Sequence, residues 1–262
     1  MKRPIENGLI SQKWLDQSTS LRTHFDVALP FPHLVLDDFL DSALAEELLA
    51  EFPDEGSMTS TRDYLFGKKF EMPEISKCGD AAFRFKQMIL GEEFSRFLNA
   101  ITGFDVFVDP ELLGGGFHQG GTGSYLDLHV DFNLHPHHQN WLRTLNILIY
   151  MNKDWQSHYG GQLRIASSPM EAPTVIDPSF NRAVIMLTGD STYHGYHRMS
   201  LPTGVTRKLL ALYAYQEIDQ NQAPAARSTH WFPQSGHIWR RALASVYNRV
   251  EGTTLARHFG RR

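Results

Sequence analysis

The residues best suited to chemistry lie in a short stretch of alternating polarity that runs from Tyr125 to Asp131. Successive side chains of a strand point to opposite faces, so its polar residues, Tyr125, Asp127, His129 and Asp131, are expected to share one face. His129 and Asp131 would then offer an imidazole and a carboxylate to one metal ion. A second histidine would complete the 2-His-1-carboxylate triad of non-haem Fe(II) sites. A polar strand face exposed to solvent would give the same short pattern.

Two histidines are candidates for the third ligand. His194 and His197 follow an apolar strand expected at 183–187, and Gly195 interrupts the alternation, so parity does not choose between them. Arg207 comes 13 residues after His194 and begins another apolar strand. A buried guanidinium is well shaped to hold a carboxylate through two parallel hydrogen bonds.

The central hundred residues resemble the Fe(II)- and 2-oxoglutarate-dependent oxygenases of the prolyl 4-hydroxylase-like group. The resemblance is carried, in order, by Gly114–Gln119, His129–Asn133, Leu145–Asn152, Gly160–Leu163, Tyr193–Gly195 and Thr206–Lys208. It implies that His129, Asp131 and His194 bind the iron and that His197 lines the mouth of the site. It also implies that Arg207 holds the distal carboxylate of 2-oxoglutarate and that Tyr150 donates its hydroxyl to the same group. The step from His194 to Arg207 is somewhat longer than is usual in the family.

The resemblance implies an enzyme that uses Fe(II), 2-oxoglutarate and O2 and releases succinate and carbon dioxide. Its reaction would be hydroxylation of an unactivated C–H bond in a prolyl or other amino-acid or peptide substrate, or in a small metabolite. Two alternatives stay open. One is a jelly-roll binding or sensor module without turnover; the other is a cupin-like metalloenzyme that does not use 2-oxoglutarate, in which Arg207 would form a structural ion pair.

Several further residues are candidates for substrate contact. Tyr125 and Asp127 are expected on the face of His129, where they would either touch substrate or hydrogen-bond within the barrel mouth. Gln119 and Arg143 would contact a polar substrate. Alternatively, Gln119 would form a hydrogen bond within a loop and Arg143 a salt bridge at the surface. The histidines at 135, 137 and 138 are expected in a solvated loop and not at a second metal. The glycines between 114 and 123 are expected to allow turns, because no phosphate-loop Gly-Lys-Ser/Thr follows them.

The surrounding pattern predicts an α+β chain with a mainly β core. Short helices are expected near 11–17, from Asp41 or Ser42 to Pro53, and at 80–90, 92–101 and 238–249, with Gly103 as a left-handed C-cap. Strands are expected within 31–40 and at 104–109, 124–132, 144–151, 162–166, 173–176, 183–188 and 207–215, and 54–77 as a long surface excursion. Many strands without helices between them predict a double-stranded β-helix, or jelly roll. We expect one structural domain comprising an N-terminal arm and supporting helical layer (1–103), the catalytic core (104–219) and a C-terminal extension (220–262).

Composition narrows the classes of partner and location. The 262 residues carry a net charge of −4, so no basic surface is expected for nucleic acid. A single cysteine, Cys78, fits a reducing cytoplasm, and no secretory leader or bilayer-spanning apolar run is expected. The sequence predicts a cytoplasmic protein that acts on a small-molecule, amino-acid or peptide substrate and leaves its oligomeric state open.

Overall fold

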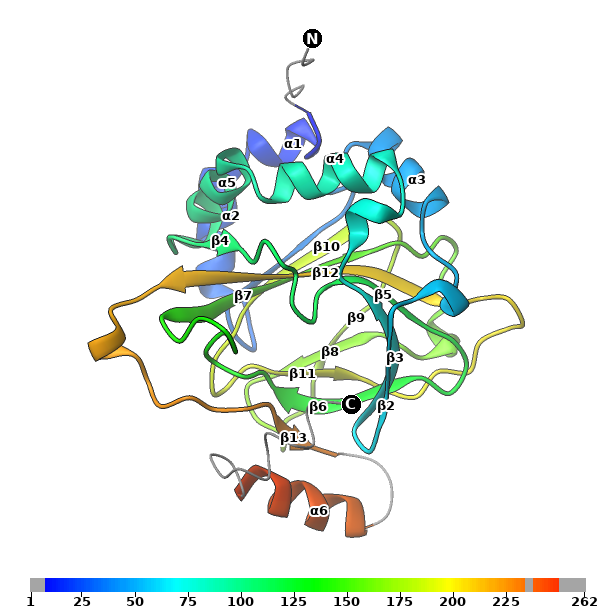
Figure 1. The fold of residues 1–262 in the computed structure, drawn as a ribbon, viewed down its shortest axis with the longest axis vertical. Coiled ribbons are helices and arrows are strands. Elements are labelled where there is room, and N and C mark those ends of the chain that lie inside the picture. The colour runs from blue at the N-terminus through cyan, green and yellow to red at the C-terminus, as the bar shows by residue number, and fades with distance from the viewer. Residues whose placement is uncertain (1–7, 234–237, 250–262) are drawn as a thin grey trace.

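The computed structural model describes residues 8–233 and 238–249, which are built around one curled antiparallel sheet (Figure 1). Its strands are β1 (His33–Leu36), β2 (Ser60–Tyr64), β3 (Gly67–Met72), β4 (Phe107–Val108), β5 (Gly116–Gly120), β6 (Tyr125–Val130), β7 (Trp141–Tyr150), β8 (Leu163–Ala166), β9 (Thr174–Ile176), β10 (Arg182–Leu187), β11 (Tyr193–Tyr196), β12 (Arg207–Glu217) and β13 (His230–Phe232). Hydrogen-bonded neighbours follow the order β1-β10-β7-β12-β5-β3-β6-β11-β8-β9. β2, β4 and β13 pair with β3, β12 and β6. The predicted jelly roll is confirmed.

The described helices lie on two sides of this sheet. They are α1 (Gln12–Leu15), α2 (Ser18–Val27), α3 (Ser42–Ala50), α4 (Asp80–Ile89), α5 (Glu92–Thr102) and α6 (Ile238–Arg249). Figure 1 shows α1 to α5 above the sheet, and α6 on the opposite side of the molecule beside β13. Short 3-10 turns lie at Glu55–Ser57, Ile75–Lys77, Ser157–Tyr159 and Gln220–Gln222. Among the described residues, no helix is both long and apolar enough to cross a membrane.

Local sequence signals explain where the supporting helices begin and end. Asp41 caps α3, since its carboxylate accepts hydrogen bonds from the amides of Ala43 and Leu44 at 3.0 and 3.2 Å. α5 buries the apolar stripe Phe94, Phe97, Leu98 and Ile101 and ends at Gly103, which adopts φ 71° as the left-handed cap. These helices therefore form as predicted and present their apolar faces to the sheet.

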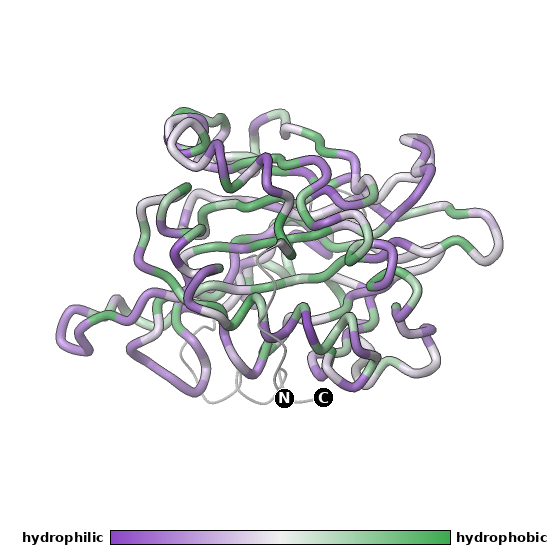
Figure 2. Tube along the Cα trace, turned by 90° about the horizontal axis from the view of Figure 1, so that it is seen from above, coloured by the Kyte–Doolittle hydropathy of each residue, from purple (hydrophilic) through white to green (hydrophobic). Residues whose placement is uncertain are grey.

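β7 shows how the sheet separates its two environments. Leu145, Ile147 and Ile149 pack into the core beneath the helices, whereas Leu148 and Tyr150 face a second apolar cluster inside the barrel. The interior cluster also contains residues of β8, β10 and β12. Seen from above in Figure 2, hydrophobic residues run along the central strands and hydrophilic ones gather in the outer loops. The interior face of the barrel is therefore the one that carries Asn146 towards the candidate site.

The segment 54–77 departs from the predicted surface excursion. It forms the β2–β3 hairpin, and β3 joins β5 to β6 within the sheet. The side chains of Phe66, Glu71 and Ile75 are buried. The charged composition of the segment concealed this strand, because β3 is held largely by main-chain pairing and not by an apolar stripe.

Three other strands, β5, β11 and β13, were also unexpected. β5 lies in a glycine-rich stretch read as turns, yet all five of its residues are buried and pair with β12 and β3. Gly116 shows why β5 needs a glycine at this position, because a Cβ there would lie 2.2 Å from the carbonyl oxygen of Met72. β13 lies in the polar C-terminal extension and pairs with β6 beside the candidate site.

Candidate active site

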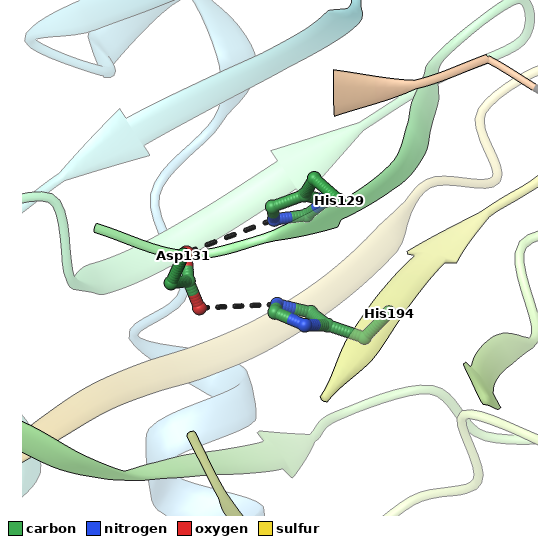
Figure 3. Close-up of side chains that lie close together, drawn as sticks. All are labelled: His129, Asp131 and His194. Atoms are coloured by element: carbon green, nitrogen blue, oxygen red, sulfur yellow. Dashed lines mark ion pairs between the residues drawn. The ribbon is translucent and has the colours of Figure 1, made fainter. Parts of the chain in front are cut away.

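Three predicted ligands meet at one end of the barrel. His129 on β6 lies directly opposite His194 on β11, and Asp131 follows the end of β6. The Asp131 carboxylate lies 3.7 Å from His129 Nε2 through Oδ1 and 3.2 Å from His194 Nε2 through Oδ2. Figure 3 shows the three side chains pointing towards one another. Their candidate ligand atoms all lie within 4.8 Å of one another, so one ion can be reached by all three.

Both imidazoles are oriented by backbone carbonyls. His129 Nδ1 lies 2.9 Å from the Asp127 oxygen, and His194 Nδ1 lies 3.2 Å from the Thr192 oxygen. A proton on Nδ1 satisfies these carbonyls and leaves the Nε2 lone pair directed at Asp131. Burial, together with the neighbouring His194, lowers the pKa of His129 to about 3. His129 is therefore neutral near pH 7, as a metal ligand must be.

Asp131 is held by two residues of β7. Arg143 Nη2 lies 3.0 Å from Asp131 Oδ2, and Asn146 Nδ2 donates to the same oxygen at 2.7 Å. Arg143 also donates to Asn146 Oδ1 from Nε and Nη2, at 3.0 and 2.7 Å. Burial opposes ionisation of Asp131, but Arg143 and His194 overcome it and hold the pKa of this carboxyl well below its usual range. The carboxylate is therefore ionised and fixed in orientation.

Arg207 lies at the inner end of the same space. It is 4% exposed and donates to the Gly161 carbonyl at 2.7 Å and to the Tyr150 hydroxyl at 3.3 Å. Its guanidinium carbon also lies 4.3 Å from the Tyr196 ring centroid. Over residues 8–233 and 238–249, Arg207 forms no ion pair with an Asp or Glu. A buried cation without an acidic partner is costly, so this arrangement favours a bound anion.

A cavity of about 1170 Å3 joins Arg207 to the triad and continues to the surface. Leu148, Leu163 and Leu209 line its inner part. Its outer part is lined by the β2–β3 hairpin, by the segment that leads into β13, and by α6. The inner end thus combines a cation with apolar walls, and the triad lies where the inner and outer parts meet.

A bulge in β6 corrects the expected face of two residues. His194 pairs with His129, and Tyr196 pairs with Leu126. Between these two pairs β6 therefore contains one residue more than β11. Such a bulge reverses the alternation. Leu126 lines the large cavity with His129 and also a separate cavity of about 220 Å3, whereas Tyr125 and Asp127 line the smaller cavity alone. The prediction that Tyr125 and Asp127 share the face of His129 is wrong.

The separate cavity also contains His197, so the structure does not place this residue at the mouth of the triad. It brings His194, and not His197, beside Asp131. Asp127 forms an ion pair with Arg240 of α6 through Oδ2, and the Tyr125 hydroxyl donates to the Leu65 carbonyl at 3.0 Å. These side chains hold α6 and the β2–β3 hairpin against β6.

The remaining candidates are also placed by their strands. Arg143 lines the large cavity, but its ion pair with Asp131 is buried, not the surface salt bridge considered as the alternative. Gln119 is buried on β5 and is among the residues that line the large cavity, and its Oε1 lacks a hydrogen-bond partner among the described residues. His137 and His138 are exposed as predicted, whereas His135 is buried with its Nε2 3.4 Å from Asp109 Oδ2. The described residues contain no metal-ligand group other than His129, Asp131 and His194.

Sequence reasoning missed two contributors to the site. Trp231 of β13 stacks on His129, with ring centroids 4.7 Å apart and planes 27° apart. Lys69 and Glu71 of β3 form an ion pair at 2.8 Å on the cavity wall. Both contributions depend on long-range strand pairing, and no local motif marks either segment.

Comparison with known proteins agrees with this geometry. Residues 115–215 match the family model of the 2OG-Fe(II) oxygenase superfamily. This segment is therefore similar to a 2OG-Fe(II) oxygenase domain. The cofactor of this family is Fe(II), and its co-substrates are 2-oxoglutarate and O2. No curated protein matches the sequence.

Solved structures share the fold of this chain at low sequence identity. A prolyl-4-hydroxylase from Pseudomonas putida is 16% identical with a TM-score of 0.53, covering 77% of this chain and 99% of its own. A Trichoplax adhaerens prolyl hydroxylase, solved with a peptide fragment of a hypoxia inducible factor, is 16% identical with a TM-score of 0.55, covering 78% and 91%. A prolyl 4-hydroxylase from Phytophthora capsici is 16% identical with a TM-score of 0.54, covering 84% and 69%. At this identity the likeness establishes the jelly roll.

Proposed function

We propose that the oxygenase is a hydroxylase in which His129, Asp131 and His194 bind the iron. The observation that carries this assignment is the convergence of two imidazoles and one carboxylate, with all ligand atoms within 4.8 Å of one another. Two nitrogen donors and one oxygen donor on one side of an ion suit Fe(II) and leave the opposite positions for exchangeable ligands.

Arg207 and Tyr150 are proposed to hold the distal carboxylate of 2-oxoglutarate. Arg207 is a buried cation, and the Tyr150 hydroxyl accepts a hydrogen bond from it, which leaves the hydroxyl proton available to a ligand. Burial raises the pKa of Tyr150, although Arg207 opposes this, so the hydroxyl stays protonated and can donate. The donor set and the apolar walls fit a small dicarboxylate whose other end reaches the triad.

The bound iron would supply oxygen activation coupled to decarboxylation of 2-oxoglutarate to succinate. The protein's own residues have separate tasks. Arg143 and Asn146 fix Asp131, and backbone carbonyls fix both histidines. The leucines of the inner cavity exclude water, and the outer cavity positions a C–H bond near the triad.

We propose that the substrate is a prolyl or other amino-acid residue, free or within a peptide, or a small metabolite. Three neighbours are named as prolyl hydroxylases, one of them in complex with a peptide fragment, which makes prolyl peptides the first compounds to screen. Nucleic acid is not expected as a partner. A cytoplasmic location completes the proposal, since a single cysteine fits a reducing compartment.

His194→Ala and His197→Ala form a matched pair for the test. Fe(II) binding by calorimetry and succinate release from 2-oxoglutarate should be lost in His194→Ala and kept in His197→Ala, with both proteins folded by circular dichroism. Mass spectrometry of the product should show a gain of one oxygen atom. Loss of iron in His197→Ala alone would refute the ligand assignment, and absence of succinate with any substrate would favour a binding module.

A further inference from the structure

The outer cavity has an apolar wall that begins at a proposed metal ligand. The Trp231 ring lies between His129 and Phe66, with centroids 4.7 and 5.2 Å away and interplanar angles of 27° and 12°. Tyr247 of α6 meets Phe66 edge-on at 5.9 Å. Leu243 and Val246 of α6 extend this wall along the cavity. We call Phe66, Trp231, Leu243, Val246 and Tyr247 the mouth wall.

The mouth wall is held in place by specific hydrogen bonds. Asn133, just beyond Asp131, exchanges two bonds with Arg227, at 2.7 and 3.2 Å, and its side chain donates to the Ala225 carbonyl at 2.9 Å. Asn248 of α6 accepts from the Trp231 amide and donates to its carbonyl, both at 3.0 Å. Figure 1 shows the result, with β13 and α6 side by side next to β6. The wall is therefore a built part of the site.

Charged side chains of the cavity already have partners. The ion pairs are Lys68–Asp63 at 3.6 Å, Lys69–Glu71 at 2.8 Å, Arg143–Asp131 at 3.0 Å and Arg227–Asp190 at 3.1 Å. Arg207 is the cation assigned above to 2-oxoglutarate. A charged substrate group would have to displace one of these pairs, or be desolvated without a partner of its own. The mouth wall is the recognition surface that remains.

Size and exposure give the same indication. Ligand pockets usually measure roughly 300 to 1,000 Å3, so a cavity of about 1170 Å3 has room for a substantial substrate beside a small dicarboxylate. Leu243 and Val246 are 46% and 57% exposed although they line it. Large apolar side chains gathered at a cavity mouth mark a binding surface.

Resting on the proposed function, we infer that the substrate inserts an uncharged apolar group, aromatic or branched aliphatic, against the mouth wall. This contact places the adjoining C–H bond at the triad, because Trp231 of the mouth wall stacks directly on His129. The group is either the side chain of a peptide residue or part of a free small molecule. Its chemistry is the same in both cases.

The test uses Leu243→Asp and Val246→Asp, two exposed positions at which a carboxylate does not disturb the fold. The matched control is Trp239→Asp on the same helix, where the side chain is 51% exposed but does not line the cavity. The probes are N-acetyl N-methylamides of Phe, Leu, Asp and Lys, and glycine-flanked pentapeptides with the same central residues. Binding is measured by anaerobic calorimetry on protein loaded with Fe(II) and 2-oxoglutarate, so it does not depend on turnover.

We expect Phe and Leu probes to bind wild-type protein about ten- to a hundredfold more tightly than Asp and Lys probes in at least one series. The series that binds identifies the source of the group. Leu243→Asp and Val246→Asp should lose this preference, whereas Trp239→Asp should keep it and all variants should bind 2-oxoglutarate equally. Equal binding of charged probes, no binding of any apolar probe, or a wall that serves only to pair two copies in sedimentation would overturn the inference. If the wild-type protein loaded with Fe(II) does not bind 2-oxoglutarate, the proposed function itself is refuted.

Discussion

The guanidinium of Arg143 lies 3.0 Å from Oδ2 of Asp131 in a space that leaves these side chains only 2% and 11% exposed. Arg143 is further enclosed by aromatic rings, with its guanidinium carbon 3.6 Å from the Tyr213 centroid and 4.6 Å from that of Phe132. Aromatic faces stabilise a cation without competing for its hydrogen bonds. Arg143 therefore acts as a positioning residue for the proposed carboxylate ligand.

Arg143→Gln should weaken Fe(II) binding by about 10- to 100-fold, as loss of an outer-sphere partner commonly does. The physical reason is that Asp131 loses the cation that keeps it ionised and oriented. Arg143→Lys should recover part of the affinity, because a charge is restored without the forked geometry.

Calorimetry with Fe(II) measures the effect of the Arg143 substitutions, after thermal unfolding has verified that each variant is folded. Arg182→Gln is the control, since Arg182 also pairs with an aspartate, Asp37 at 2.6 Å, but does not line the cavity that contains the triad. Unchanged iron affinity in Arg143→Gln would contradict a positioning role.

Arg207→Ala should weaken 2-oxoglutarate binding by about 2 to 4 kcal/mol, because a charge-assisted contact in a buried site is lost. Tyr150→Phe should cost about 1 kcal/mol, the usual contribution of one neutral hydrogen bond. Fe(II) binding should change little in either variant. A titration of Arg207→Ala with 2-oxoglutarate that matches wild type would exclude the proposed role.

The sequence indicated His129, Asp131 and His194 through the ordered motifs of the family resemblance, because strand parity alone left His194 and His197 as alternatives. Alternation holds along β7 from Asn146 to Tyr150, since six consecutive register pairs, from Leu145 to Tyr150, tie this part of the strand to β12. In β6 the same reasoning failed at Tyr125 and Asp127. A single extra residue reversed the parity there, and bulges leave no clear mark on local sequence.

The walls of the cavity were hidden for a different reason. Phe66 and Trp231 lie 165 positions apart and meet only because β3 and β13 both pair with β6. β3 and β13 have neither an apolar run nor an obvious alternation, and the contact depends on long-range pairing. Local propensity has little influence on such edges, where tertiary context decides the structure.

Gly195 tests whether the bulge positions His194. A Cβ at this position would lie 2.7 Å from the Leu126 oxygen and 2.8 Å from the Asp127 oxygen, both fixed backbone atoms. Gly195→Ala should therefore push β11 away from β6, lower stability by about 1 to 3 kcal/mol and weaken metal binding.

The control for Gly195→Ala is Gly189→Ala, because a Cβ at Gly189 has no heavy atom within 4 Å. Surface changes of that kind usually stay within about 0.5 kcal/mol. Thermal unfolding and Fe(II) calorimetry measure the two consequences. A Gly195→Ala protein that matches the control in both would show that the close approach of β11 to β6 is dispensable.

His118 should make the protein sensitive to acid. It is 5% exposed, with Nε2 3.0 Å from the Gly114 oxygen and Nδ1 3.5 Å from Lys69 Nζ. Burial, and then the charge of Lys69, lower the pKa of His118 from 6.5 to about 3. The unfolded chain therefore binds a proton that the folded chain refuses, so stability is complete above about pH 6.5 and falls as the pH drops towards 3.

The contribution of His118 should amount to about 1 to 2 kcal/mol between pH 7 and pH 5. His118→Gln should remove it, giving a flatter dependence of unfolding free energy on pH over this interval. Urea unfolding at both pH values, with chelator present to keep every sample free of metal, provides the measurement. His158→Gln, at an exposed position, is the control and should retain the wild-type slope. If the unfolding free energy of His118→Gln keeps the wild-type dependence on pH, His118 has a similar pKa in the folded and unfolded protein. Burial between Gly114 and Lys69 then does not prevent its protonation.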